Sequence, residues 1–207
     1  LENLPESSRY YTGAGLYRGV RLVILNPVHV AHWGTFVTTP VVSVDKAIVD
    51  VRTNVCVRTK QKGKIKLVTE ILDQEGKKVA KAISTSHQAD SIFYHQKLQM
   101  KSPHLWSVSS PYLYSVLSKV FVDGKMADCY LTTMGIRSID FDTNKGFLLN
   151  GQPFKLKGVC LHHDLGPIGA AVNVAALKRQ LRLLKEMGSN AIRTSHNPPS
   201  REFLQLT

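Results

Sequence analysis

The sequence has few cysteines and no long apolar segment. Its three cysteines, Cys56, Cys129 and Cys160, lie far apart in apolar-rich segments. That spacing excludes a disulfide framework and a zinc motif, so we expect three small buried side chains. No apolar run reaches the roughly 18 residues of a membrane span, and the polar residues after Leu1 lack the pattern of a secretory leader. With 43% hydrophobic and 20% charged residues, the composition is that of a globular protein.

Acidic residues are also scarce, since 15 Asp and Glu stand against 27 Lys and Arg for a formal charge of +12. A basic chain suits an anionic partner such as nucleic acid. The densest run consists of Lys60, Lys62, Lys64 and Lys66, and its alternate spacing is typical of the solvated face of a strand. Few aromatic residues are interleaved with these lysines, which leaves little for base stacking. We therefore expect no nucleic-acid partner and keep DNA binding by this run as a minor hypothesis.

What the chain contains instead is a series of segments in which apolar and polar residues alternate. The clearest covers residues 46–58, and its inward face would carry Ala47, Val49, Val51, Thr53, Val55 and Val57. Similar segments cover residues 64–72, 78–85, 91–100, 112–122 and 128–136, and an earlier one at 16–25 suggests the end of a preceding sheet domain. Turn residues separate most of them and no helical pattern intervenes, which predicts an antiparallel β-sandwich of about 100 residues. We expect Trp106 to be a core or corner aromatic rather than a platform for sugar.

The pattern changes after the last of these segments. Asn150-Gly151 lies between two apolar segments and predicts a two-residue hairpin turn. A short strand through Val159, a helix that begins after Asn173 and a buried parallel strand at residues 190–193 should follow. This β, α, β order is typical of the start of a (β/α)₈ barrel, and the chain stops before such a barrel is complete.

Polar side chains follow each of these two parallel strands. His162, His163 and Asp164 come after the first strand, and Arg193, Ser195, His196 and Asn197 come at the end of the second. In a right-handed βαβ unit the carboxyl ends of neighbouring strands meet at one rim, so the two clusters should share a pocket. Histidine, arginine and asparagine are hydrogen-bonding groups that suit hydroxyl-rich ligands.

Two other chemistries are less well supported by these clusters. His162, His163, Asp164 and His196 include the ligand types of a metal site, but adjacent histidines at a strand end usually point apart. Ser195 with His196 could be a nucleophile and its base, yet sequence neighbours rarely make that hydrogen bond and no nucleophile elbow surrounds them. We therefore expect no metal and no catalytic nucleophile in this segment.

Several motifs together resemble the family 2 glycoside hydrolases, which include β-galactosidases, β-mannosidases and β-glucuronidases. They are "SPHLWSVSSPYLYSV", "MGIR", "GFLLNGQPFKLKGVCLHHD" and "GSNAIRTSHNPP". "YYTGAGLYRGVRL" and "PVHVAHWGTFVTTP" are similar to the end of that family's sugar-binding jelly roll and its passage into the next domain. The resemblance implies a jelly-roll end at residues 1–30, an immunoglobulin-like sandwich at 31–137 and a truncated TIM barrel at 138–207.

The resemblance also implies roles for particular residues. His162, Arg193 and His196 match family positions that shape the pocket around the terminal sugar. Asp164 and Asn197 are further substrate-binding candidates, although Asn197 stands where the family often has an aromatic residue. In the family both catalytic glutamates lie on later barrel strands, so no catalytic residue is expected here.

The number and positions of the acidic residues agree with that expectation. Retaining glycoside hydrolysis needs two carboxyl groups about 5 to 5.5 Å apart. After Ser138 the acidic residues are Asp140, Asp142, Asp164, Glu186 and Glu202. Of these, only Asp164 follows a barrel strand closely enough to reach the pocket, and one carboxylate cannot be both acid/base and nucleophile. We therefore predict that this chain alone hydrolyses nothing.

The sequence thus favours a fragment of a retaining glycosidase. We expect the longer enzyme to be a β-galactosidase, whose carbohydrate substrate is a β-galactoside. The alternative is a non-catalytic carbohydrate-binding or protein-interaction module built on the sandwich. We expect no cofactor in this fragment, while a divalent cation in the longer enzyme and a homo-oligomer stay open. A periplasmic or extracellular location would follow only from the family.

Overall fold

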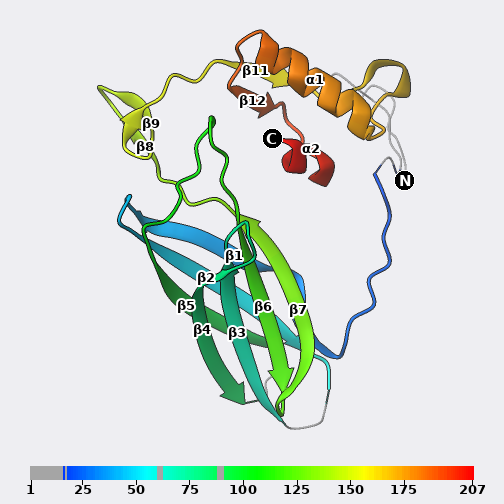
Figure 1. The fold of residues 1–207 in the computed structure, drawn as a ribbon. Coiled ribbons are helices and arrows are strands. Elements are labelled where there is room, and N and C mark those ends of the chain that lie inside the picture. The colour runs from blue at the N-terminus through cyan, green and yellow to red at the C-terminus, as the bar shows by residue number, and fades with distance from the viewer. Residues whose placement is uncertain (1–15, 17, 60–62, 88–90) are drawn as a thin grey trace. The chain divides into compact units, whose positions relative to one another are not determined.

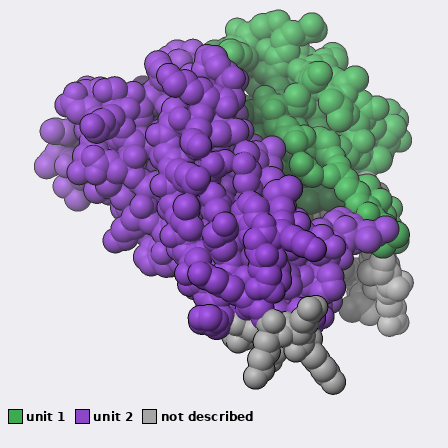
Figure 2. Space-filling model, turned by 60° about the horizontal axis from the view of Figure 1, so that its bottom comes forward, with its two compact units in different colours: residues 1–22, 156–207 green, residues 23–155 purple. Residues whose placement is uncertain are grey.

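The computed structural model describes residue 16 and residues 18–59, 63–87 and 91–207. It divides into two compact units, which Figure 2 distinguishes by colour. One unit consists of residues 23–155, and the other of residues 1–22 together with 156–207. Each unit is described separately below.

The larger unit is an antiparallel β-sandwich (Figure 1). Its 3-stranded sheet has the order β1 (Val28–Val42), β2 (Lys46–Val57), β5 (Ser91–Lys101). Its 4-stranded sheet has the order β4 (Lys78–His87), β3 (Lys64–Leu72), β6 (Tyr114–Val122), β7 (Lys125–Met134). The predicted mainly β fold is therefore confirmed, and the strands that were predicted after residue 45 begin and end within a few residues of the expected positions.

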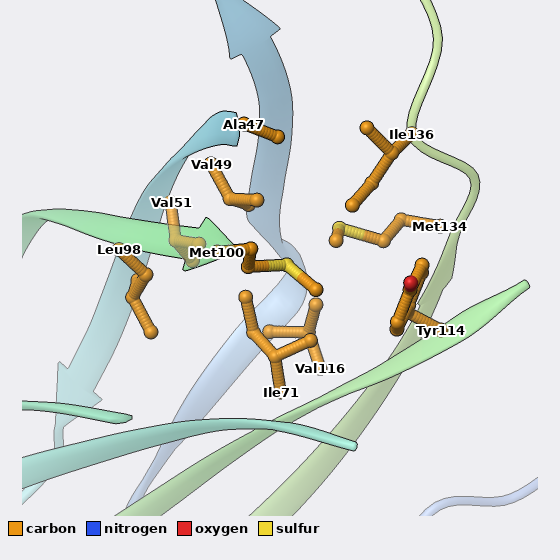
Figure 3. Close-up of a cluster of buried hydrophobic side chains, with 10 residues drawn as sticks. All are labelled: Ala47, Val49, Val51, Ile71, Leu98, Met100, Tyr114, Val116, Met134 and Ile136. Atoms are coloured by element: carbon orange, nitrogen blue, oxygen red, sulfur yellow. The ribbon is translucent and has the colours of Figure 1, made fainter. Parts of the chain in front are cut away.

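The core of the sandwich lies between the two sheets. Strict alternation along β2 and β5 turns every second side chain inward, as the pattern of residues 46–58 predicted. Figure 3 shows one cluster of these side chains, in which Ile71 and Val116 of one sheet meet Val51 and Leu98 of the other. A second cluster around Val55 and residues of β3 and β6 continues the core along the sandwich. Burial of such side chains provides most of the stability of a sandwich of this size.

The strand predicted at residues 16–25 is wrong. The described residues of that segment form no strand, and the first strand that the structure describes is β1, which the sequence pattern did not predict. The alternation of β1 is interrupted because its pairing with β2 shifts register between Val30 and Thr35 and again between Thr38 and Val41. Such bulges insert unpaired residues and hide the two-residue period.

The first bulge of β1 exposes an aromatic residue in an unusual backbone conformation. Trp33 has a φ of 52° and is 83% exposed, and its indole stacks on His32. A Cβ at Gly34 would lie 2.7 Å from the carbonyl oxygen of Ala31, so the bulge needs glycine at that position. A bulky residue at positive φ is strained. The glycine that follows Trp33 lets the backbone pack closely on Ala31, so Gly34 stabilises the bulge.

Trp106 is a corner aromatic, as predicted. Its backbone N–H donates to the carbonyl of Ile136 over 2.8 Å, and the guanidinium of Arg137 lies 4.4 Å from the ring centroid. A Cβ at Gly135 would come within 2.9 Å of the indole, which shows how closely the ring packs on this backbone. The ring is therefore packed against Gly135 and makes a cation–π contact with Arg137.

The prediction of three buried cysteines is wrong. Cys129 and Cys160 are exposed and Cys56 is half-buried. The reason is the phase of each strand, because Val55 and Val57 point into the core and Cys56 between them points outward. An apolar neighbourhood along the chain does not place a side chain in the core when the element is a strand.

The lysine run is only partly described, since Lys60 and Lys62 lie outside the described residues. Beyond them the predicted alternation is present: Lys64 is exposed, and the ammonium of Lys66 lies 4.7 Å from the centroid of the Phe121 ring. The intervening Ile65 is buried. Lys64 and Lys66 therefore belong to the solvated face of the 4-stranded sheet.

A small meander ends the larger unit. It consists of β8 (Ile139–Asp142), β9 (Gly146–Leu149) and β10 (Gln152–Pro153). The predicted hairpin turn is confirmed, because Asn150 and Gly151 have φ values of 52° and 75°. The Asn150 side chain also joins the meander to the sandwich. Its oxygen accepts from the Ser138 N–H and its nitrogen donates to the Trp106 carbonyl, each over 3.0 Å.

The smaller unit is a βαβ unit followed by a short helix (Figure 1). Its elements are β11 (Gly158–Leu161), the 3₁₀ turn η1 (Gly166–Ile168), α1 (Val174–Glu186), β12 (Ala191–Thr194) and α2 (Arg201–Leu206). The two strands pair in parallel, as predicted. Asn173 caps α1 by accepting from the Ala176 N–H over 3.0 Å, and Ser200 caps α2 in the same way. In the part of the chain that the structure describes, neither helix is long and apolar enough to cross a membrane.

Candidate sugar-pocket residues at the ends of two parallel strands

The carboxyl ends of β11 and β12 bring two histidines together. Leu161 pairs with Thr194, and the pairing extends by one bond, in which the Ser195 N–H donates to the Leu161 carbonyl over 3.1 Å. Directly beyond this bond, the rings of His162 and His196 lie edge to face with centroids 6.1 Å apart. The two polar clusters of the sequence therefore meet where the βαβ geometry predicts.

His196 occupies a tight turn after β12. Its φ of 60° places the backbone in the left-handed region, which reverses the chain directly after the strand. The following Asn197 stabilises the same turn, because its side-chain nitrogen donates to the Ser195 carbonyl over 3.0 Å. Asn197 thus has a structural contact within the loop in addition to its predicted role.

Asp164 also has a local contact. Its Oδ1 accepts from the Gly166 N–H over 2.6 Å, and this bond supports the start of the η1 turn. The carboxylate of Asp164 therefore stabilises the loop after β11. The two carboxylates on the helices of this unit are engaged elsewhere, Glu186 with Arg182 and Glu202 with Arg21, each at 3.6 Å.

Arg193 lies beside a residue that the sequence analysis did not select. Parallel register places Arg193 opposite Cys160, and the guanidinium Nη1 lies 3.9 Å from the sulfur. Both side chains are exposed on the same face of the two-stranded sheet. The Ser195 hydroxyl and the Arg193 guanidinium lower the pKa of the Cys160 thiol. The sequence could have predicted this contact through the parallel register of β11 and β12, which places Cys160 opposite Arg193.

A cavity of about 60 Å³ lies on the helix-facing side of the same sheet, and His162, His163 and Asn197 line it from the loops. Leu161 and Thr194 line it from the strands, Leu177 from α1 and Phe203 from α2. The Arg18 guanidinium, which also lines it, donates to the Pro198 carbonyl over 2.5 Å. Ligand pockets usually hold about 300 to 1,000 Å³, so this apolar space is too small to be a sugar site.

The described residues contain no group of three or more His, Cys, Asp or Glu side chains arranged to hold a metal ion. His162, His163, Asp164 and His196 therefore do not form such a group. The expectation that the fragment carries no cofactor stays a prediction.

Comparison with known proteins relates both units to one family. The family model "Glycosyl hydrolases family 2" matches residues 28–137, and "Glycosyl hydrolases family 2, TIM barrel domain" matches residues 142–207. The chain is 42% identical over 202 residues to beta-galactosidase BoGH2A of Bacteroides ovatus, and the match covers 97% of this chain and 24% of that protein. It is 37% identical to a putative beta-glucuronidase of Formosa agariphila, covering 98% of this chain and 19% of that protein.

Solved structures agree with this relationship. The crystal structure of a glycosyl hydrolase family 2 member from Bacteroides cellulosilyticus matches with a TM-score of 0.90 and 42% identity, over 96% of this chain and 28% of that one. Bacteroides uniformis beta-glucuronidase matches with a TM-score of 0.89 and 29% identity, over 98% of this chain and 25% of that one. The chain thus spans about a quarter of these relatives, as a sandwich followed by the start of a TIM barrel. It belongs to glycosyl hydrolase family 2.

Proposed function

We propose that this chain is part of a retaining glycoside hydrolase that removes terminal non-reducing β-D-galactosyl residues. The relatives are glycosidases, and they carry the names beta-galactosidase and beta-glucuronidase. The match to a beta-galactosidase, 42% identical over 97% of this chain, favours the galactoside. The division into a jelly-roll end at 1–30, a sandwich at 31–137 and a barrel start at 138–207 is part of the same proposal.

The observation that carries the site proposal is the contact between His162 and His196. Two imidazoles at the ends of adjacent parallel strands offer donors and acceptors within one sugar width of each other. The C-terminal rim of a (β/α)₈ barrel is where such enzymes place their active sites. Arg193 adds a guanidinium fork from the strand that leads to His196. In the proposal these three residues bind hydroxyl groups of the terminal sugar, and Asp164 and Asn197 hold the loops that position them.

The chain alone should not catalyse hydrolysis. The reaction needs one carboxyl group that donates a proton to the leaving oxygen and a second that attacks the anomeric carbon, about 5 to 5.5 Å away. In the smaller unit Asp164, Glu186 and Glu202 each have separate contacts, with Gly166, Arg182 and Arg21. The two catalytic carboxylates would therefore come from barrel strands that follow this segment in the relatives.

The experiment compares the complete gene product that contains this chain with the isolated 207-residue chain. We expect the complete protein to hydrolyse nitrophenyl β-galactoside and the isolated chain to show no turnover. His162→Ala and His196→Ala in the complete protein should each lower kcat/KM about 10- to 100-fold, the loss expected when a hydrogen bond to a substrate hydroxyl is removed. Lys145→Ala, an exposed change in the turn between β8 and β9, is the matched control and should leave kcat/KM unchanged.

The possible failures point to different parts of the proposal. Preference for nitrophenyl β-glucuronide would overturn the galactoside assignment and leave the glycosidase assignment intact. Unchanged kcat/KM in both histidine variants would remove them from the sugar pocket. Turnover by the isolated chain would contradict the requirement for carboxylates from outside it.

A second candidate function is non-catalytic carbohydrate binding by the sandwich. The outer face of the 3-stranded sheet presents Phe36 and Phe93, both exposed, with Arg52 in register beside Phe36. Exposed rings flanked by hydrogen-bonding groups can stack on sugar rings. Glycan binding by residues 23–137 that is lost in Phe36→Ala and Phe93→Ala would support this function. Absence of binding to a glycan array would contradict it.

A further inference from the structure

The core of the sandwich is not apolar throughout. Its buried side chains form two clusters, one around Ile71 and Val116 (Figure 3) and the other around Val55 and Leu67. Where the two clusters meet, each strand of the two sheets turns one polar side chain inward. These residues, which we call the polar layer, are Thr35, Thr53, Thr69, Ser84, Gln96, Ser118 and Thr132.

The order of residues along β6 shows how the layer arises. Ser118 lies between Val116 of the first cluster and Val120 of the second, and all three are 0% exposed. On β2, Thr53 is 1% exposed and lies between valines of the two clusters in the same way. Side chains two positions apart in a strand point to the same side, so these polar residues face the interior as the valines do. The layer therefore separates the two apolar parts of the core.

Most oxygens of the polar layer have no hydrogen-bond partner among the described residues. They are Oγ1 of Thr35, Thr53, Thr69 and Thr132, Oγ of Ser118 and Oε1 of Gln96, and all are buried. The Nε2 of Gln96 donates to the Ser84 Oγ over 3.0 Å, which joins the two sheets within the layer. Burial of a polar group without a partner is unfavourable, and native proteins satisfy nearly all such groups. A whole layer of them indicates a partner other than the side chains themselves.

The chemistry of the layer narrows what that partner can be. Its side chains are hydroxyl groups and one carboxamide, so no charge within the layer would stabilise a buried ion. Thr35 and Thr53 are register partners in one sheet, and Thr69 and Ser118 are register partners in the other. Hydroxyl groups that both donate and accept therefore enter the layer in pairs from both sides. Serine is smaller than valine, so Ser118 also fills less of the gap between the sheets than its neighbours on β6.

We propose that the polar layer is a binding site for internal water, whose molecules bridge the hydroxyl groups of the 3-stranded and 4-stranded sheets. An internal water makes about three hydrogen bonds, and paired hydroxyl groups on both sheets supply that number. The bridges hold the sheets together where apolar packing is interrupted. The site lies inside the sandwich, so it depends neither on the proposed glycosidase activity nor on the barrel that this chain only begins.

The first test measures internal water in the 207-residue chain. Oxygen-17 magnetic relaxation dispersion detects water molecules that stay inside a protein far longer than surface water does, and its amplitude follows their number. Ser118→Val fills the layer and Thr69→Val removes a hydroxyl group without changing its shape, so each should lower the amplitude by about one water molecule. Thr133→Val is the matched control, because this exposed residue of β7 lies outside the layer and its loss should leave the amplitude unchanged.

Thermal unfolding gives an independent reading of the same layer. Thr53→Val and Thr69→Val should each lower the midpoint by about 2 to 6 °C if the hydroxyl groups bind water, because the water then loses a partner. The midpoint should rise if the hydroxyl groups are dry, because an unpaired polar group is removed. Val51→Thr, at the neighbouring inward position of β2, calibrates the cost of a hydroxyl group in an apolar cluster and should lower the midpoint.

The outcomes separate a hydrated layer from a dry one. Circular dichroism shows whether each variant is folded, and the shape-conserving Thr69→Val keeps the test decisive if Ser118→Val unfolds. An amplitude that falls in the layer variants, together with lowered midpoints, would support the proposal. No dispersion in the parent chain, an amplitude that is unchanged in both layer variants, or raised midpoints in Thr53→Val and Thr69→Val would overturn it.

Discussion

The imidazole rings of His162 and His196 meet edge to face, 6.1 Å apart between centroids, although each follows a different strand. The contact depends on the parallel pairing of β11 with β12 and on the turn at His196. It places two groups that can both donate and accept hydrogen bonds at the end of the sheet. The backbone of that turn therefore matters as much as the rings.

The first prediction concerns the turn at His196, whose φ is 60°. His196→Gly should keep the turn, because glycine adopts this conformation at no steric cost. His196→Val should destabilise the smaller unit by about 1 to 2 kcal/mol, since a β-branched residue is strained at positive φ. Hydrogen exchange of the Ser195 N–H, which donates to the Leu161 carbonyl, measures the effect. Equal protection in the two variants would show that the turn is not strained.

The second prediction compares two isoleucines of the 4-stranded sheet. Ile71 is 0% exposed and lies in the core cluster of Figure 3, whereas Ile83 is 56% exposed on the outer face. Ile71→Ala should lower the free energy of unfolding by about 2 to 5 kcal/mol, because it leaves a cavity between the sheets. Ile83→Ala should change it by less than about 0.5 kcal/mol. Urea denaturation of both variants measures the difference, and similar losses would contradict the assignment of the core.

The third prediction is a pH dependence that centres on Glu70. Its carboxylate accepts from the Lys119 ammonium over 2.7 Å and lies near Lys78 and Lys81, and only 12% of its side chain is exposed. The hydrogen bond from Lys119 lowers the pKa of Glu70 below its ordinary value of 4.5. A carboxylate with a lowered pKa stabilises the fold above that ordinary value, and the contribution is lost as the pH falls through the folded value.

Glu70→Gln should therefore lower the free energy of unfolding by about 1 kcal/mol at pH 7, where the ion pair is intact. The difference from the parent protein should shrink as the pH falls below about 4.5, where the glutamate of the unfolded chain is protonated. Thermal unfolding between pH 3 and pH 7 measures both curves. A difference that is constant across this range would mean that the charge of Glu70 does not contribute.

The fourth prediction concerns the glycine of the β1 bulge. Gly34→Ala should destabilise the sandwich by about 1 to 3 kcal/mol, because the new Cβ would lie 2.7 Å from the backbone oxygen of Ala31. Gly19→Ala is the control, since nothing lies within 4 Å of its Cβ position. Thermal denaturation followed by circular dichroism measures both. A neutral Gly34→Ala would show that the bulge relaxes around the methyl group.

The sandwich was largely predictable because its strands expose one face to water and bury the other. Residues 46–57 show this most clearly, with valines inward and polar residues outward. β1 was not predicted because two bulges interrupt its two-residue period. The segment 16–25 has the alternation of a strand, but its described residues form no strand. Alternation predicts a strand only where pairing is regular on both sides.

The site was predictable in part for a different reason. The handedness of the βαβ unit fixes which strand ends meet, so His162 and His196 could be placed together without any knowledge of side chains. The contact between Cys160 and Arg193 depends on exact register, and a shift by one residue would have separated them. The local contacts of Asp164 and Asn197 depend on loop conformation, which residue type does not determine.

The strained bulge of β1 has an optical consequence. The chain contains two tryptophans, and Trp33 is open to water while Trp106 lies beneath the Arg137 guanidinium. Acrylamide should quench the emission of Trp33 in the native state, and a Trp33→Phe variant should leave a single, bluer fluorophore at the corner of the sandwich. In a denaturation curve followed by fluorescence, the emission of Trp33 should therefore change little on unfolding, whereas the emission of Trp106 should change strongly.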